Sequence, residues 1–148
     1  MPSTGRLDAI WVKRARRGPM DAATSAQLVV GQGIVGNAEQ GGRRQVTIIA
    51  REVFDQLREE LGPGVDPVMR RANLLISGVE LAETRGRILH VGRVRIRVNG
   101  ETRPCERMDE AYPGLTDALR PGWRGGVYGE VLDDGPIAIG DPVRWDAD

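Results

Sequence analysis

Glycine and proline interrupt this chain so often that long helices are excluded over most of its length. Its 148 residues include 20 glycines and 9 prolines, and both are spread from one end to the other. Both residues break helices, and both are common in the tight turns that connect short strands. We therefore expect many short strands joined by turns, and not a helical bundle.

The segments between these turns have the patterns of strands. Residues 93–98 (RVRIRV) alternate strictly, which places Val94, Ile96 and Val98 on one face and three arginines on the solvated face. Asn99-Gly100 follows as a strong turn signal. The other expected strands are residues 7–16, 26–30, 45–50, 73–77, 87–91, 127–132, 136–139 and 142–145.

One segment has helical periodicity. Residues 51–61 (REVFDQLREEL) place four apolar side chains at helical spacing, and Gly62-Pro63-Gly64 should end that helix. The four are Val53, Phe54, Leu57 and Leu61. Residues 105–120 have no strand pattern, so we expect short helical turns there. The prediction is one mostly-β domain over residues 1–148, a β-barrel with one clear α-helix and some short helical turns.

Composition excludes several classes of function. The 21 basic and 21 acidic residues give a net charge of zero, which argues against a nucleic-acid or membrane-surface partner. The chain has no apolar run near the length of a membrane span, and its first residues lack a secretory signal. One cysteine and one histidine exclude a disulfide framework and the usual zinc sites. We expect a cytoplasmic protein in a reducing environment.

Residues 31–36 (GQGIVG) match the glycine fingerprint of dinucleotide-binding folds. That site needs a helix that begins at the third glycine and faces the pyrophosphate. Only eight residues, 37–44, separate this glycine from the next expected strand, and a crossover with its helix needs roughly 10–12. We therefore expect a glycine-rich turn that lines a pocket, and no nucleotide cofactor.

The cysteine, Cys105, stands in an unusually basic setting. It lies in TRPCER, with Arg103 and Arg107 two positions away on either side. Positive charge favours the thiolate, which is the form that carries sulfur or binds a soft metal. If Pro104 begins a helical turn, the helix N-terminus acts in the same direction. The alternative is a buried, inert cysteine.

Several segments, taken in order, resemble the MOSC domain, which is named for the C-terminal part of molybdenum-cofactor sulfurase. The resemblance covers nearly the whole chain and implies a β-barrel like the small barrel domain of pyruvate kinase. Its most specific part is R-x-N before an apolar strand and Ser-Gly, followed by the lone Pro-Cys some thirty residues later. The matching segments are GQGIVGN (31–37), RRQVTII (43–49), RRANLLISGVEL (70–81), GRILHVGRVRI (86–96), TRPCERMD (102–109), RGGVYGEVLDDG (124–135) and IAIGDPV (137–143).

The resemblance implies sulfur carriage as a persulfide on Cys105, binding of molybdenum cofactor, or both. In relatives that reduce N-hydroxylated compounds, the corresponding cysteine ligates molybdenum, and the arginine and asparagine of R-x-N contact the pterin-phosphate. Carried over, these residues are Cys105, Arg71 and Asn73. The further candidates for binding the cofactor are Arg103, Ser77, Gly36 and Asn37.

This chain also departs from its larger relatives. They often have Gly-Asp-x-His in the first glycine loop, whereas Asn37, Ala38 and Glu39 follow Gly36 here. The sequence contains neither the aminotransferase-like domain of the pyridoxal phosphate-linked sulfurases nor the N-terminal barrel module of the reductases. We therefore expect a small standalone member of the family.

Three functions stay open at this point. The first is a sulfur carrier or cofactor-binding domain, supplied by a cysteine desulfurase-type donor. The second is a molybdenum-dependent reductase component that needs an electron-transfer partner. The third is a non-catalytic binding barrel that has lost the chemistry.

Two smaller expectations concern the surroundings of the site. Arg71 and Asn73 lie two residues apart before an apolar strand, so their side chains should share one face, unless Arg71 instead pairs with Glu80 or Asp66. Trp123, with the glycine pair that follows it, is a candidate for the border of the pocket.

Overall fold

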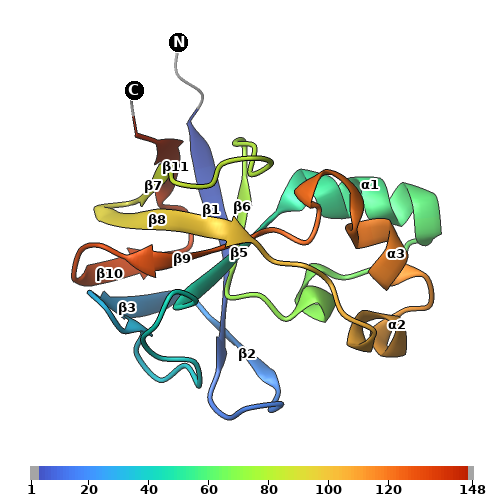
Figure 1. Cartoon of the computed structure of the whole chain (residues 1–148), viewed down its shortest axis with the longest axis horizontal. Helices are drawn as coiled ribbons and strands as arrows, with labels where there is room; N and C mark the ends of the chain where they lie inside the picture. The colour runs from blue at the N-terminus through green and yellow to red at the C-terminus, as the bar shows by residue number, and fades with distance from the viewer. Residues whose placement is uncertain (1–3, 147–148) are drawn as a thin grey trace.

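The computed structural model describes residues 4–146, and its centre is a closed barrel of seven strands (Figure 1). Around the barrel the strands follow the order β11-β7-β8-β9-β5-β6-β1, and pairing of β1 with β11 closes it. Their bounds are β1 (Gly5–Lys13), β5 (Val46–Ala50), β6 (Leu74–Ser77), β7 (Ile88–Val91), β8 (Val94–Glu101), β9 (Val127–Val131) and β11 (Pro142–Trp145). The predicted mostly-β barrel is confirmed.

Four further strands lie outside the closed ring. β2 (Met20–Ala23) forms a hairpin with β1, while β10 (Gly135–Ala138), β3 (Ser25–Val29) and β4 (Gly33–Ile34) make a small sheet in that order. β2 and β4 were not predicted, and the first strand ends at Lys13, earlier than expected. The short β2 has little strand character of its own, and it is held by pairing along the exposed edge of the longer β1.

The barrel interior is filled by apolar side chains. On β8, Val94, Ile96 and Val98 are fully buried, so the alternation predicted for residues 93–98 is confirmed. The arginines between them point outward and meet acids of the neighbouring chain segments, with Arg95 2.9 Å from Asp133. Because this face is solvated and paired, it is not a basic groove. The packed interior leaves only the barrel ends and the connecting segments for chemistry.

The helices gather on one side of the barrel (Figure 1). α1 (Arg51–Leu61) and η1 (Pro67–Arg70) connect the parallel strands β5 and β6, as a crossover must. α2 (Arg107–Ala111), α3 (Leu115–Leu119) and η2 (Pro121–Trp123) follow β8. Their apolar side chains form a second core with Phe54 and Leu57 of α1. The predicted helix over residues 51–61 and the short helical turns after residue 105 are therefore confirmed.

The turn predicted at Asn99-Gly100 is wrong. β8 continues through both residues to Glu101, and its pairing with β9 shifts register between Val98 and Gly100. A side chain at Gly100 would come within 3.0 Å of the Tyr128 hydroxyl, while the amide of Asn99 donates to the Arg43 carbonyl at 2.7 Å. A dipeptide typical of turns is used here as a bulge, which bends the strand around the barrel.

Arg124 ties the helices together. Its guanidinium donates to both carboxylate oxygens of Glu60 on α1, at 2.9 and 2.6 Å, and to the Ala118 carbonyl on α3 at 3.0 Å. The hydrogen bond from Arg124 lowers the pKa of Glu60 below its usual value. A carboxyl group whose pKa is lower in the folded state stabilises that state above its unfolded pKa, and this contribution is lost as the pH falls through the folded pKa.

We expect Glu60→Gln to lower the free energy of unfolding at pH 7, and this loss to vanish in acid. Urea unfolding of both proteins between pH 7 and pH 3 would measure the difference. The control is Glu59→Gln, because Glu59 is exposed and makes no ion pair with any described residue. A deficit of Glu60→Gln that stays constant with pH would contradict the expectation.

Candidate functional site

The thiol of Cys105 is exposed on the segment that connects β8 to α2. The backbone carbonyl of Cys105 accepts hydrogen bonds from the amide of Met108 at 3.0 Å and from the hydroxyl of Thr116 at 2.8 Å. These two bonds fix the backbone of the segment. The helix begins at Arg107, so Pro104 does not start it and Cys105 lies outside it. The alternative of a buried cysteine is wrong, and the thiol is open to a reaction partner.

A buried arginine, Arg70, holds the segment that leads to Cys105. Arg70 lies at the end of η1 and is only 6% exposed. Its Nε donates to the carbonyl of Gly125 at 3.0 Å, and its Nη2 approaches the carbonyl of Arg103 at 3.5 Å. The hydroxyl of Thr102 donates to the same Gly125 carbonyl at 2.6 Å. A side chain at Gly125 would clash with the carbonyl of Thr102, so glycine is needed at this junction.

The charge of Arg70 has no acidic partner within 4.0 Å among residues 4–146. Burial lowers the pKa of Arg70 to about 10, and the positive charge of Arg44 acts in the same direction, whereas the Cys105 thiolate raises it. Arg70 therefore stays protonated at neutral pH. A buried cation without a counter-ion favours a nearby anion, and this holds for a thiolate, a persulfide or an anionic ligand.

Asn73 belongs to a buried hydrogen-bond network at the barrel end where β1 ends and β5 and β6 begin. Its Oδ1 accepts from the amide and the hydroxyl of Thr47, both at 3.1 Å. Its Nδ2 donates to the carbonyl of Trp11 at 3.1 Å and to Oδ1 of Asn37 at 3.2 Å. Both asparagines are buried, and the side-chain donors and acceptors of Asn73 are occupied within the protein. The side chain of Asn73 thus connects three segments of the barrel end.

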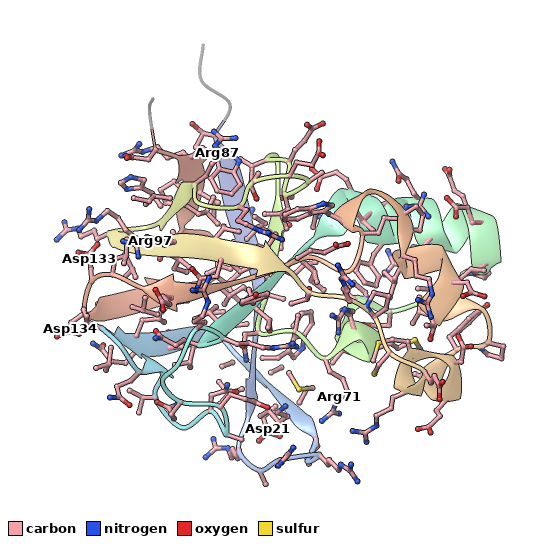
Figure 2. All side chains as sticks on the ribbon, in the orientation of Figure 1. Asp21, Arg71, Arg87, Arg97, Asp133 and Asp134 are labelled. Carbon is pink, nitrogen blue, oxygen red and sulfur yellow. The ribbon has the colours of Figure 1, made fainter. Side chains whose placement is uncertain are left out.

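Arg71 lies beside this network. Its backbone is left-handed (φ 62°), and its guanidinium donates to the carbonyl of Gly18 in the β1–β2 turn. Figure 2 labels Arg71 near the β1–β2 hairpin. It pairs with neither Glu80 nor Asp66, and the latter caps η1 instead. Arg71, Asn73, Asn37 and Arg44 line a cavity of about 30 Å³, which has room for about one water molecule.

The remaining candidates are spread more widely. Ser77 is the last residue of β6 and pairs with Arg6 of β1. It is four residues along the extended chain from Asn73, a distance of roughly 13 Å. Gly36 has φ 88° and directs the chain so that Asn37 enters the network. Residues 37–45, all of them described, contain no helix, as the short spacing after Gly36 predicted. Arg103 is exposed and contributes its carbonyl to Arg70.

The sequence pattern did not single out Arg70 or Arg44. Arg71 matches the R-x-N pattern, and nothing local distinguishes it from the arginine before it. The structure buries Arg70 next to the cysteine segment and turns Arg71 away to the β1–β2 hairpin. No local signal in the sequence distinguishes Arg70 from Arg71, because both precede the strand in a 3-10 turn and its left-handed cap.

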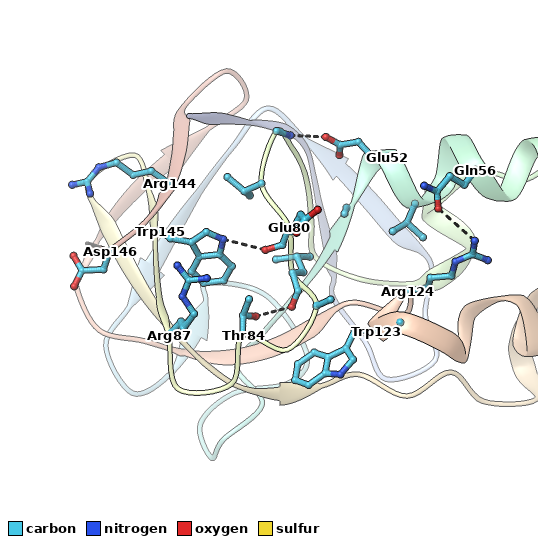
Figure 3. A pocket seen from close by; sticks show the side chains of 17 residues that line it. Glu52, Gln56, Glu80, Thr84, Arg87, Trp123, Arg124, Arg144, Trp145 and Asp146 are labelled. Carbon is cyan, nitrogen blue, oxygen red and sulfur yellow. Dashed lines mark hydrogen bonds between the residues drawn. The ribbon is translucent and has the colours of Figure 1, made fainter. Parts of the chain in front are cut away.

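A much larger cleft, of about 1040 Å³, opens at the other end of the barrel (Figure 3). It lies between α1, the loop that follows β6, the η2 turn and the end of β11. Trp123 lines this cleft. It was expected to border the pocket of Cys105, but Cys105, Arg70, Arg71 and Asn73 do not line the cleft. The cleft and the cysteine segment are therefore separate features.

Two negative findings concern the described residues, 4–146. No three of their histidine, cysteine, aspartate and glutamate side chains lie close enough together to hold a metal ion. None of their helices is long and apolar enough to cross a membrane.

Comparison with known proteins agrees with this fold. A family model described as MOSC domain matches residues 35–144. YuaD from Bacillus subtilis has a similar structure, with a TM-score of 0.82 and 18% identity over 96% of this chain and 95% of that one. YiiM from Geobacillus stearothermophilus gives a TM-score of 0.79 and 18% identity, over 97% of this chain and 75% of that one. No curated protein sequence matches the chain.

We expect Asn73→Ala to lower the free energy of unfolding by about 2–4 kcal/mol, because it leaves buried partners of Asn73 without hydrogen bonds. Chemical denaturation would measure this change. Ser77→Ala, at the end of the strand that follows Asn73, is the control and should change stability by less than about 1 kcal/mol, since no side-chain hydrogen bond of Ser77 is seen in the described structure. An Asn73→Ala protein as stable as the wild type would show that the network is not structural.

Proposed function

Because the chain belongs to the MOSC domain family, which is linked to molybdenum cofactor sulfurase-type function, we propose that Cys105 carries sulfur as a persulfide. One observation carries the proposal: an exposed thiol follows a segment held by Arg70, a buried cation without an acidic partner among the described residues. Such a cation stabilises the anionic forms of sulfur that the reaction uses.

The proposed step is a transfer between persulfides. The Cys105 thiolate attacks the terminal sulfur of a donor persulfide, R–S–SH, and a new S–S bond forms on Cys105 as the donor S–S bond breaks. The donor leaves as the thiolate RS⁻, so one sulfur atom moves and no external oxidant or reductant is needed. Arg70 favours the negative charge on Cys105 before the transfer and on the persulfide after it.

The exposed position of Cys105 suits a protein donor, and we propose a partner of the cysteine desulfurase type. A flexible persulfide-bearing loop of such a donor can reach a thiol on a surface segment, whereas it cannot enter a closed pocket. Because the thiol must stay unpaired between transfers, we place the protein in a reducing compartment, the cytoplasm.

The fit of molybdenum cofactor to this site is incomplete. A thiolate is a suitable soft ligand for molybdenum, and Arg70, Arg71 and Arg44 would suit a phosphate. However, the cavity beside Arg71 and Asn73 is about 30 Å³, whereas pockets for small organic ligands have roughly 300–1,000 Å³. That cavity is too small for a pterin, and Cys105 does not line it, so we derive no step through the cofactor. We therefore propose sulfur carriage ahead of the reductase role.

Incubation with a cysteine desulfurase and L-cysteine should increase the mass of the intact protein by about 32 Da, the mass of one sulfur atom. Cys105→Ser should gain nothing, and a reductant should reverse the gain in the wild type. If the wild-type protein takes up no sulfur from this donor or from glutathione persulfide, the proposal is wrong and the non-catalytic barrel is favoured.

The role of Arg70 can be tested separately. We expect Arg70→Gln to slow the alkylation of Cys105 by iodoacetamide severalfold, because Arg70 holds the segment that presents the thiol and its charge attracts the anionic sulfur. Arg70→Lys keeps the charge and should recover most of the rate, while thermal unfolding checks that each variant is folded.

Arg107→Gln is the matched control, because Arg107 is exposed and makes no ion pair in the described structure. It should change the rate less than twofold, since solvent screens an exposed charge. If Arg107→Gln slowed the alkylation more than Arg70→Gln did, the positive charge that acts on Cys105 would come from the arginines that flank it in the sequence, and the proposed role of Arg70 would be wrong.

A further inference from the structure

The cleft at the other barrel end has the shape and size of a small-molecule site. Its volume of about 1040 Å³ is ample for a ligand of a few rings. Its floor is apolar and buried, with Ala50, Val79 and Leu81 each at most 8% exposed. Two tryptophans, Trp123 and Trp145, line it, and Figure 3 shows them on different parts of its wall.

The two tryptophans have different hydrogen-bonding states. The indole N–H of Trp145 donates to the carbonyl of Glu80 at 3.0 Å, which fixes its ring. The indole N–H of Trp123 has no acceptor among the described residues, and the side chain is only partly buried. Trp123 also has a left-handed backbone (φ 59°), which is uncommon for a large side chain. The η2 turn thus presents an aromatic ring with a free donor to the cleft.

Arg87 supplies a free cation in the same cleft. Its guanidinium lies over the ring of Trp145, 4.6 Å from the centroid, so stacking sets its plane (Figure 3). No described residue accepts a hydrogen bond from its side chain or pairs with it as an acid within 4.0 Å. An arginine held flat in this way keeps its N–H groups available for a carboxylate or phosphate.

The acids that line the cleft are largely occupied. The carboxylate of Glu52 accepts from the amide of Gly78 at 2.7 Å, and that of Asp146 lies 2.8 Å from Nε2 of His90. Arg124 is bound by Glu60, outside the cleft. Three acids and three arginines line the cleft, so their formal charges cancel, and the anion preference rests on the unpaired guanidinium of Arg87.

We propose that this cleft binds a small planar aromatic molecule that carries a terminal oxyanion, either a carboxylate or a phosphate. The ring packs against Trp123 and the apolar floor, and the oxyanion binds the guanidinium of Arg87. The site is distinct from Cys105 and does not depend on sulfur carriage.

Titration with naphthalene-2-carboxylate, followed by amide NMR of the full chain, tests the proposal. The amides of Gly78, Thr84 and Gly122 and the indole N–H of Trp123 should shift and saturate together, while the amide of Cys105 should not. Naphthalene-2-carboxamide, which has the ring without the charge, should bind about tenfold more weakly, since it loses the charge-assisted hydrogen bond. Phenyl phosphate in a parallel titration shows which of the two oxyanions is preferred.

Variants assign the two contacts. Arg87→Gln should weaken binding of the carboxylate about tenfold and remove its advantage over the amide, whereas Trp123→Leu should weaken both probes. Arg85→Gln is the control, because Arg85 is an exposed arginine of the same loop that does not line the cleft. Cys105→Ser should bind both probes as the wild type does. Absence of saturable shifts at millimolar probe, or equal binding by Arg87→Gln and Arg85→Gln, would overturn the proposal.

Discussion

Pairing of the first strand with the last is the constraint on which this structure depends. Gly5 and Arg6 of β1 pair with Val143 and Pro142 of β11, and this short contact turns an open sheet into a barrel. β1 also pairs with β6 and with β2, so this one strand has three pairing partners. Its register with β6 shifts after Leu7, which is typical of a bulge that bends the strand. Closure encloses the apolar side chains completely, so polar chemistry is confined to the barrel ends and the connections between strands.

The Gly125 carbonyl joins one of these connections to the barrel. It accepts from Arg70, which arrives from the crossover between β5 and β6, and from Thr102, which leaves β8 toward Cys105. The cysteine segment is therefore held by contacts between parts of the chain more than twenty residues apart. The same buried cation interacts electrostatically with Cys105, so one side chain both holds the segment and belongs to the proposed sulfur site.

The periodic segments were predictable because their signal is local. The alternation in β8 and the apolar spacing of α1 depend on neighbours within one element. The turn prediction at Asn99-Gly100 was wrong because the hydrogen bond to Arg43 and the packing on Tyr128 come from distant segments. The role of Arg70 was missed for the same reason. Its neighbour Arg71 matched a family pattern, and only the folded chain shows which of the two guanidinium groups faces the cysteine segment. Asn73 and Asn37 were each predicted as candidates for binding the cofactor, and in the structure they hydrogen-bond to each other within the network of the barrel end.

The η2 turn has a consequence for how this protein can change. Trp123 belongs to the wall of the large cleft, whereas Gly125, two residues later, fastens the segment of the reactive thiol. Any insertion or deletion in these few positions would reshape both regions at once. Elsewhere in the sequence the two regions are free to diverge, but at this turn they must be inherited as a pair.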